Sequence, residues 1–97
     1  MKNRICEKII RHETRRDGSY TYDYILKEIQ SERVPCYKLP LYSVEIRLTD
    51  AFGKRTEAET KELFADVGRA TSFYEMLERN LATPIDLPYI VEDELIH

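Results

Sequence analysis

The stretch from Tyr42 to Thr49, YSVEIRLT, carries the clearest structural signal in the chain. Apolar and polar residues alternate along it, with Val44 and Ile46 on one side and Glu45 and Arg47 on the other. Successive side chains of a strand point to opposite faces, so this period of two predicts a strand with one face in the core and one in water. One wet face is typical of an antiparallel sheet.

Two further strands are predicted before this one, which itself spans residues 41–49. Residues 3–14 mix β-branched and charged side chains, and residues 20–30 are rich in tyrosine and aliphatic residues. Both compositions favour strands. Between them, Asp17-Gly18 is typical of a tight hairpin turn, because glycine accepts the positive φ that such turns require. The prolines of residues 31–40 predict a loop between the second strand and the third.

Residues 55–67 follow a turn around Gly53 and are interpreted as the fourth strand. Their many Glu and Lys residues also suit a helix, and that alternative stays open at this point.

Two short helices are predicted at the C-terminal end. Ser72 and Glu75 have the spacing of a capping box, and the apolar residues that follow recur at helical intervals, which predicts a helix over residues 72–80. Asp86 is a suitable cap for a second helix over residues 87–95. Neither helix is long enough to be stable alone, so both are expected to pack on the sheet.

The predicted architecture is therefore α+β: a four-stranded antiparallel β-meander followed by two C-terminal helices packed on one face. The 97 residues are expected to form a single domain, residues 1–97, because a chain of this length can bury one core but not two.

Charge is distributed unevenly along the chain. Residues 1–40 hold nine Lys and Arg against six Asp and Glu, and residues 41–97 hold six against twelve, which gives the net charge of −3. An acidic C-terminal half makes nucleic acid an unlikely partner, because such binding depends on clustered cations. The charged residues near the N-terminus do not fit a signal peptide, and no apolar run is long enough to span a membrane. We therefore expect a cytoplasmic protein without membrane contact.

The candidate reactive residues do not combine into a recognisable site. Cys6 and Cys36 lack the spacing of a metal or redox motif, and whether they approach each other is left open. His12 is too far along its strand from Cys6 to form a nucleophile pair with it. Glu92, Asp93 and Glu94 are successive helical residues that point in different directions and cannot hold one metal ion together. No catalytic, cofactor-binding or metal-ligating residue is predicted, and no cofactor.

Two groups of residues are candidates for an interaction surface. Tyr20, Tyr22 and Tyr24 share one face of the strand at residues 20–30, where they would either stack nucleobases or form the floor on which the helices pack. Glu92 and Asp93 place negative charge near a helix C-terminus, where it is mildly unfavourable, so a basic partner would neutralise it.

The closing segment, Thr83-Pro84-Ile85-Asp86-Leu87-Pro88-Tyr89-Ile90-Val91-Glu92-Asp93-Glu94-Leu95, resembles that of a family of small bacterial proteins of unknown function, mainly from Firmicutes. The family's segment is Thr-Pro-x-x-Leu-x-x-Val-Val-x-Asp-x-Leu, and this chain has Ile90 at the first valine. The resemblance implies a tyrosine-bearing hairpin, a further strand and this closing segment. It implies no catalytic or ligand-binding residue.

These observations together predict a small cytoplasmic protein-interaction or regulatory domain without catalytic activity. A homo-oligomer or a protein partner is expected, because the edge strand of a meander can pair with a copy of itself. Two alternatives are single-stranded nucleic-acid binding through the tyrosine face and small-molecule sensing.

Overall fold

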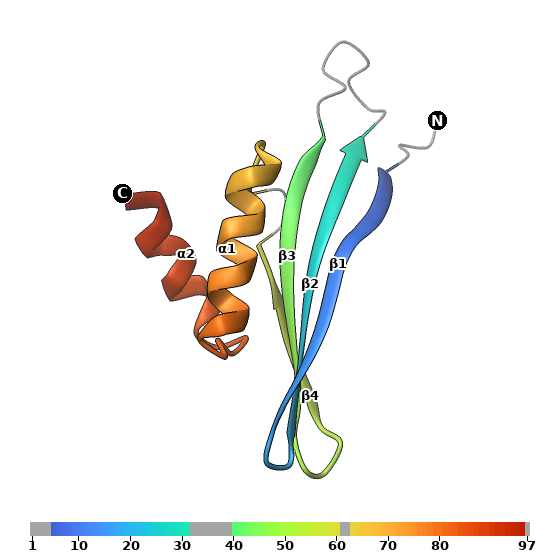
Figure 1. Cartoon of the computed structure of the whole chain (residues 1–97), viewed down its shortest axis with the longest axis vertical. Helices are drawn as coiled ribbons and strands as arrows, with labels where there is room; N and C mark the ends of the chain where they lie inside the picture. Colours follow the sequence, from blue (N-terminus) through green and yellow to red (C-terminus); the bar gives the residue numbers. More distant parts are fainter. Residues whose placement is uncertain (1–4, 32–39, 61–62, 97) are drawn as a thin grey trace.

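Four antiparallel strands form one open sheet, and strands that are neighbours in sequence are neighbours in space. The computed structural model describes residues 5–31, 40–60 and 63–96. The strands are β1 (Ile5–Asp17), β2 (Tyr20–Ser31), β3 (Leu41–Thr49) and β4 (Arg55–Glu59), in the order β1-β2-β3-β4. Two C-terminal helices follow, α1 (Val67–Arg79) and α2 (Leu87–Ile96). The predicted α+β meander with two helices is confirmed (Figure 1).

The hairpin between β1 and β2 closes through a two-residue turn. Asp17 lies opposite Tyr20 in the register, so only Gly18 and Ser19 lie between the strands. Gly18 has a φ of 63°, which a residue with a side chain adopts at a cost. Because the turn is so short, β1 continues to Asp17, beyond the predicted end at residue 14.

A β-bulge interrupts the pairing of β1 with β2. Ile9 lies opposite Lys27, but Arg11 lies opposite Leu26, so Ile10 is the extra residue. Cross-strand partners point to the same face of a sheet. The bulge therefore places Arg11 on the face of Leu26, which α1 covers, and it sets the face to which every later side chain of β1 points.

The predicted strand over residues 55–67 is too long: only its first part is a strand. β4 ends at Glu59, and Phe64 returns to form an isolated bridge with Tyr42. α1 begins at Val67, five residues before the predicted start at residue 72, because Asp66 caps it: its side chain accepts from the amide of Arg69 at 2.8 Å. Ser72 lies within the helix and is exposed.

The core lies between the sheet and α1. α1 packs on β2 and β3, and α2 lies on the far side of α1 from the strands (Figure 1). The predicted packing of both helices on the sheet therefore holds for α1, whereas α2 contributes chiefly Leu87, which is 2% exposed. Ile90 and Val91 of α2 are partly buried against the core. The fully buried side chains of the helix-covered side come from both layers: Tyr24, Leu26, Val44, Ile46, Ala70, Tyr74 and Leu77.

Candidate interaction surfaces

An arginine-rich groove runs between β1 and α1. We call it the β1–α1 groove and define it by its lining residues: Arg11, Arg15, Arg16, Glu75, Glu78, Arg79 and Leu81. Its volume is about 570 Å³. The bulge at Ile10 and the strand alternation aim Arg11 and Arg15 towards the helix layer. The residues that line the groove include four arginines and two glutamates, which gives it an excess of positive charge.

Two of these arginines are held by acidic residues of α1. Arg11 Nη1 donates to Glu75 at 2.9 Å, and its guanidinium lies 5.0 Å from the centre of the Tyr74 ring. Arg15 Nε donates to Glu78 at 2.7 Å. The hydrogen bond to Glu75 raises the pKa of Arg11 above its ordinary value. These contacts, between residues more than 60 positions apart, join the edge strand to the helix.

The other two arginines of the groove are free to bind. Arg16 and Arg79 are exposed, and neither forms an ion pair with any residue in the described ranges. Guanidinium groups present donors in a fixed planar fork that matches a carboxylate or a phosphate. The groove therefore combines two arginines held in place with two that are available to an anionic partner.

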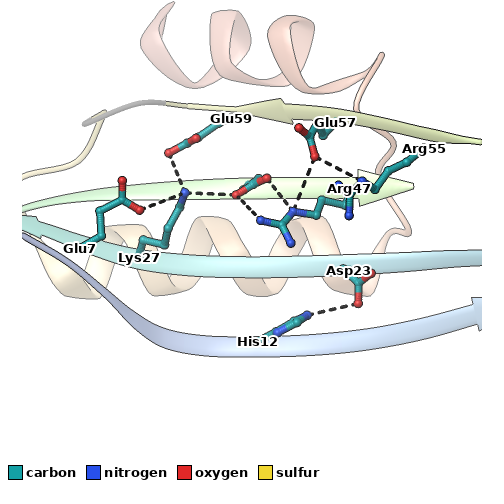
Figure 2. A network of polar contacts seen from close by, with 9 residues as sticks. Glu7, His12, Asp23, Lys27, Arg47, Arg55, Glu57 and Glu59 are labelled. Carbon is teal, nitrogen blue, oxygen red and sulfur yellow. Dashed lines mark hydrogen bonds and ion pairs between the residues drawn. The ribbon is translucent and has the colours of Figure 1, made fainter. Parts of the chain in front are cut away.

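The opposite face of the sheet carries a network of ion pairs centred on Lys27 (Figure 2). The Lys27 ammonium lies 3.1 Å from a carboxylate oxygen of Glu45, 3.1 Å from Glu59 and 3.6 Å from Glu7. Only 11% of the Lys27 side chain is exposed. The four residues come from all four strands, so the network ties the sheet together across its full width.

Arg47 extends this network along the sheet. Its Nε donates to Glu45 at 2.8 Å and lies 3.7 Å from Glu57. Beside it, Asp23 accepts from Thr14 at 2.7 Å and lies 3.2 Å from His12 Nε2. The pKa values of Glu45 and Asp23 are both lowered, although burial alone would raise them. Hydrogen bonds from Arg47 and Lys27 outweigh burial at Glu45. Hydrogen bonds from Thr14 and His12 do the same at Asp23.

The chemistry of Lys27 follows from the same contacts. Burial would lower its pKa, but the hydrogen bonds to Glu45 and Glu59 outweigh that effect and raise it. An amine acts as a nucleophile or a base only when it is deprotonated. Lys27 therefore remains a cation at neutral pH, and the network holds strands together rather than supplying a reactive amine.

The tyrosine face is not a surface for stacking bases. Tyr24 is fully buried, Tyr22 is 9% exposed, and only Tyr20, at 47%, is open to solvent. The Tyr24 hydroxyl donates to the carbonyl of Ala82 at 2.9 Å. The idea of a three-tyrosine platform is therefore wrong, because α1 packs against β2 on this face. The competing interpretation, a floor for the helices, is what Tyr22 and Tyr24 provide.

The acidic candidates Glu92 and Asp93 are exposed on α2. Neither forms an ion pair with a described residue, whereas their neighbour Glu94 lies 3.8 Å from Arg69 of α1. Within the described ranges no three His, Cys, Asp or Glu side chains gather as metal ligands would. Cys36 lies outside the described residues, so the Cys6–Cys36 distance stays open.

The free edge of β1 is a further candidate surface. In the described part of the chain β1 pairs with β2 alone, and next to the bulge Ile9 is 58% exposed and Ile10 38%. Charged side chains along this edge and the bulge itself both oppose indiscriminate strand pairing. A partner strand at this edge must accordingly match the charges of β1.

The groove and the Lys27 network were missed by reasoning from the sequence. One signal was present: the alternation Arg11, Glu13, Arg15 marks one face of the strand as charged. It did not reveal that this face meets the acidic residues of α1, because that contact joins segments far apart in the chain.

Comparison with known proteins gives one positive finding. The model of a family of unknown function, DUF6514, matches residues 1–97. No curated protein matches the chain, and no solved structure does. No helix in the described part of the chain has the length and apolar character needed to cross a membrane. The Firmicutes distribution expected from the closing segment stays a prediction. Because the family model covers the whole chain, the protein belongs to the family of unknown function DUF6514.

Proposed function

We propose that the protein is a small cytoplasmic protein-interaction domain that acts by binding rather than by catalysis, and that its β1–α1 groove receives an acidic protein segment. The observation that carries this proposal is the pair Arg16 and Arg79, two exposed arginines among the lining residues of one groove, neither of which has an ion-pair partner among the described residues. Charge-assisted hydrogen bonds from arginine to carboxylate are among the stronger polar contacts that proteins make.

The charges around the groove favour an acidic protein segment over a nucleic acid. Glu75 and Glu78 form part of its wall, and the chain as a whole has a net charge of −3. A phosphate backbone is bound by a run of cations and is repelled by carboxylates placed among them. A peptide can instead place isolated carboxylates opposite Arg16 and Arg79 and avoid the two glutamates.

This proposal is tested by a nuclear magnetic resonance titration of the full chain with a short peptide of alternating Glu and Ala. The backbone amide signals of β1 and α1 are expected to shift, and the shifts are expected to weaken as salt is added. The same peptide with Gln in place of Glu should leave the signals unchanged.

Matched variants locate the binding. Arg16→Glu with Arg79→Glu should abolish the shifts, whereas Arg55→Glu, an exposed charge reversal on β4, should leave them in place. Shifts confined to other strands, or equal binding of the Gln peptide, would refute the groove. Tighter binding of a single-stranded oligonucleotide than of the acidic peptide would assign the groove to nucleic acid instead.

A second candidate is a homo-oligomer formed by pairing of β1 edges, and the thirteen-residue edge with its exposed Ile9 and Ile10 favours it. Such pairing is two-fold and closes at a dimer. Ile10→Lys should shift the dimer towards monomer in light scattering, and Phe52→Lys, a change at a 95% exposed turn residue, should not. A dimer that ignores Ile10→Lys rules out edge pairing.

A further inference from the structure

The outward face of α2 combines an aromatic ring with unpaired negative charge. Tyr89 is 70% exposed, and Glu92 and Asp93 follow it by three and four positions. Residues at these spacings lie on the same side of a helix. All three are exposed, and neither carboxylate has an ion-pair partner within the described part of the chain. We call these residues the α2 outer face.

The α2 outer face complements the β1–α1 groove. The groove includes Arg16 and Arg79, which form no ion pair with a described residue, and the apolar Leu81. Two carboxylates can pair with two guanidiniums, while the tyrosine ring can pack on Leu81 or beneath a guanidinium group. The uneven charge of the chain agrees with this pairing: β1 lies in the basic residues 1–40, and α2 lies in the acidic residues 41–97.

The two surfaces cannot meet within one molecule in this arrangement. α1 lies between α2 and the strands (Figure 1), and Glu94 is paired with Arg69 near the start of α1, whereas Arg79 ends that helix. We infer that the α2 outer face of one copy docks into the β1–α1 groove of a second copy. This inference rests on the groove of the proposed function and names its partner.

The contact has consequences for assembly. Its two surfaces differ, so two copies either exchange both contacts reciprocally or share one contact and leave one groove and one α2 outer face open. The reciprocal exchange closes at a dimer, whereas single contacts extend into rings or open chains. A ten-residue helix is about 15 Å long, so the interface is small and the affinity weak. Self-association is therefore expected at high micromolar concentration and at low salt.

Sedimentation velocity of the full chain over a concentration series tests the inference with two charge reversals. The groove variant carries Arg16→Glu and Arg79→Glu, and the helix variant carries Glu92→Lys and Asp93→Lys. Each is expected to weaken self-association at least about tenfold, because like charges then face each other. These four side chains are exposed and form no ion pair with a described residue, so circular dichroism should show that both variants are folded.

The decisive sample is the chain that carries all four substitutions. Its groove is acidic and its helix basic, so self-association is expected to return to within about threefold of the original chain. An equimolar mixture of the groove and helix variants should also associate. Failure of the four-fold variant to associate, or an effect of the groove variant without one of the helix variant, would overturn the inference.

The outcomes also separate this inference from the proposed function and from edge pairing. A strictly monomeric chain that still binds the acidic peptide in its groove keeps the proposed function and removes α2 as the partner. A dimer that is lost with Ile10→Lys but kept in both charge-reversal variants likewise overturns the inference, because it assigns self-association to the edge of β1.

Discussion

The Tyr74 hydroxyl of α1 donates a hydrogen bond to the backbone carbonyl of Tyr24 in β2, at 3.0 Å. The Tyr24 hydroxyl donates in turn to the carbonyl of Ala82, beyond the end of α1. Burial raises the pKa of both phenols well above its ordinary value, so both remain protonated donors at neutral pH. Two buried tyrosines thus join the sheet to α1 and to the turn before α2.

Replacement of Tyr24 by Phe should lower the free energy of unfolding by about 1–2 kcal/mol, because the buried carbonyl of Ala82 loses its donor. Chemical denaturation measures this change. Tyr20→Phe is the matched control: Tyr20 is 47% exposed, and its replacement should change stability by less than about 0.5 kcal/mol. Equal effects of the two substitutions would contradict a special role for the Tyr24 hydroxyl.

Replacement of Lys27 by Met should cost about 3 kcal/mol, because it leaves the carboxylate of Glu45 buried beside that of Glu59 without their shared cation. Lys54→Met, in an exposed turn, serves as the control. Adding Glu45→Leu to Lys27→Met should recover much of the lost stability. Removing both partners of a buried ion pair costs less stability than removing one partner and leaving the other charge buried. A single variant as stable as the original chain would show that the network adds nothing.

Stability should fall with acidification in a defined range. Asp23 and Glu45 have a pKa that is lower in the folded protein than in the unfolded chain, where it is about 4. Their contribution is therefore fully present above about pH 4 and is lost as the pH falls through the folded values. Denaturation curves from neutral pH downwards measure the slope. Glu45→Gln should flatten it, and an unchanged slope would assign the effect to other carboxyls.

Replacement of Gly18 by Ala should destabilise the chain by about 1 kcal/mol, because the φ of 63° costs a residue with a Cβ atom that amount. No atom outside its immediate chain neighbours lies within 4 Å of an added Cβ. The cost therefore comes from the local backbone conformation and not from a clash with another part of the protein. Thermal unfolding checks it, with Ser19→Ala as the neighbouring control. A neutral Gly18→Ala would show that the turn relaxes to another type.

Local patterns explain which parts of the fold could be predicted. Alternation in residues 41–49 depends only on the period of the strand, and Asp17-Gly18 acts within the turn that it forms. The start of α1 was misplaced because two caps compete: Ser72 with Glu75 has the right spacing, but Asp66 is the residue whose side chain receives the Arg69 amide. The fourth strand also ends earlier than predicted, at Glu59, before Phe64 forms its isolated bridge with Tyr42.

The sequence by itself determined the order of the strands and the presence of two helices, because these follow from local patterns. It was wrong about the polar face of β3, which it placed in water: Ser43 is 0% exposed and Glu45 7%. Only the tertiary structure decided that Tyr24 is buried, that Lys27 gathers three carboxylates and that Arg16 and Arg79 share a groove. These outcomes depend on strand register, on the bulge at Ile10 and on the docking of α1. Each of these brings together residues that are far apart along the chain, so no local pattern records them.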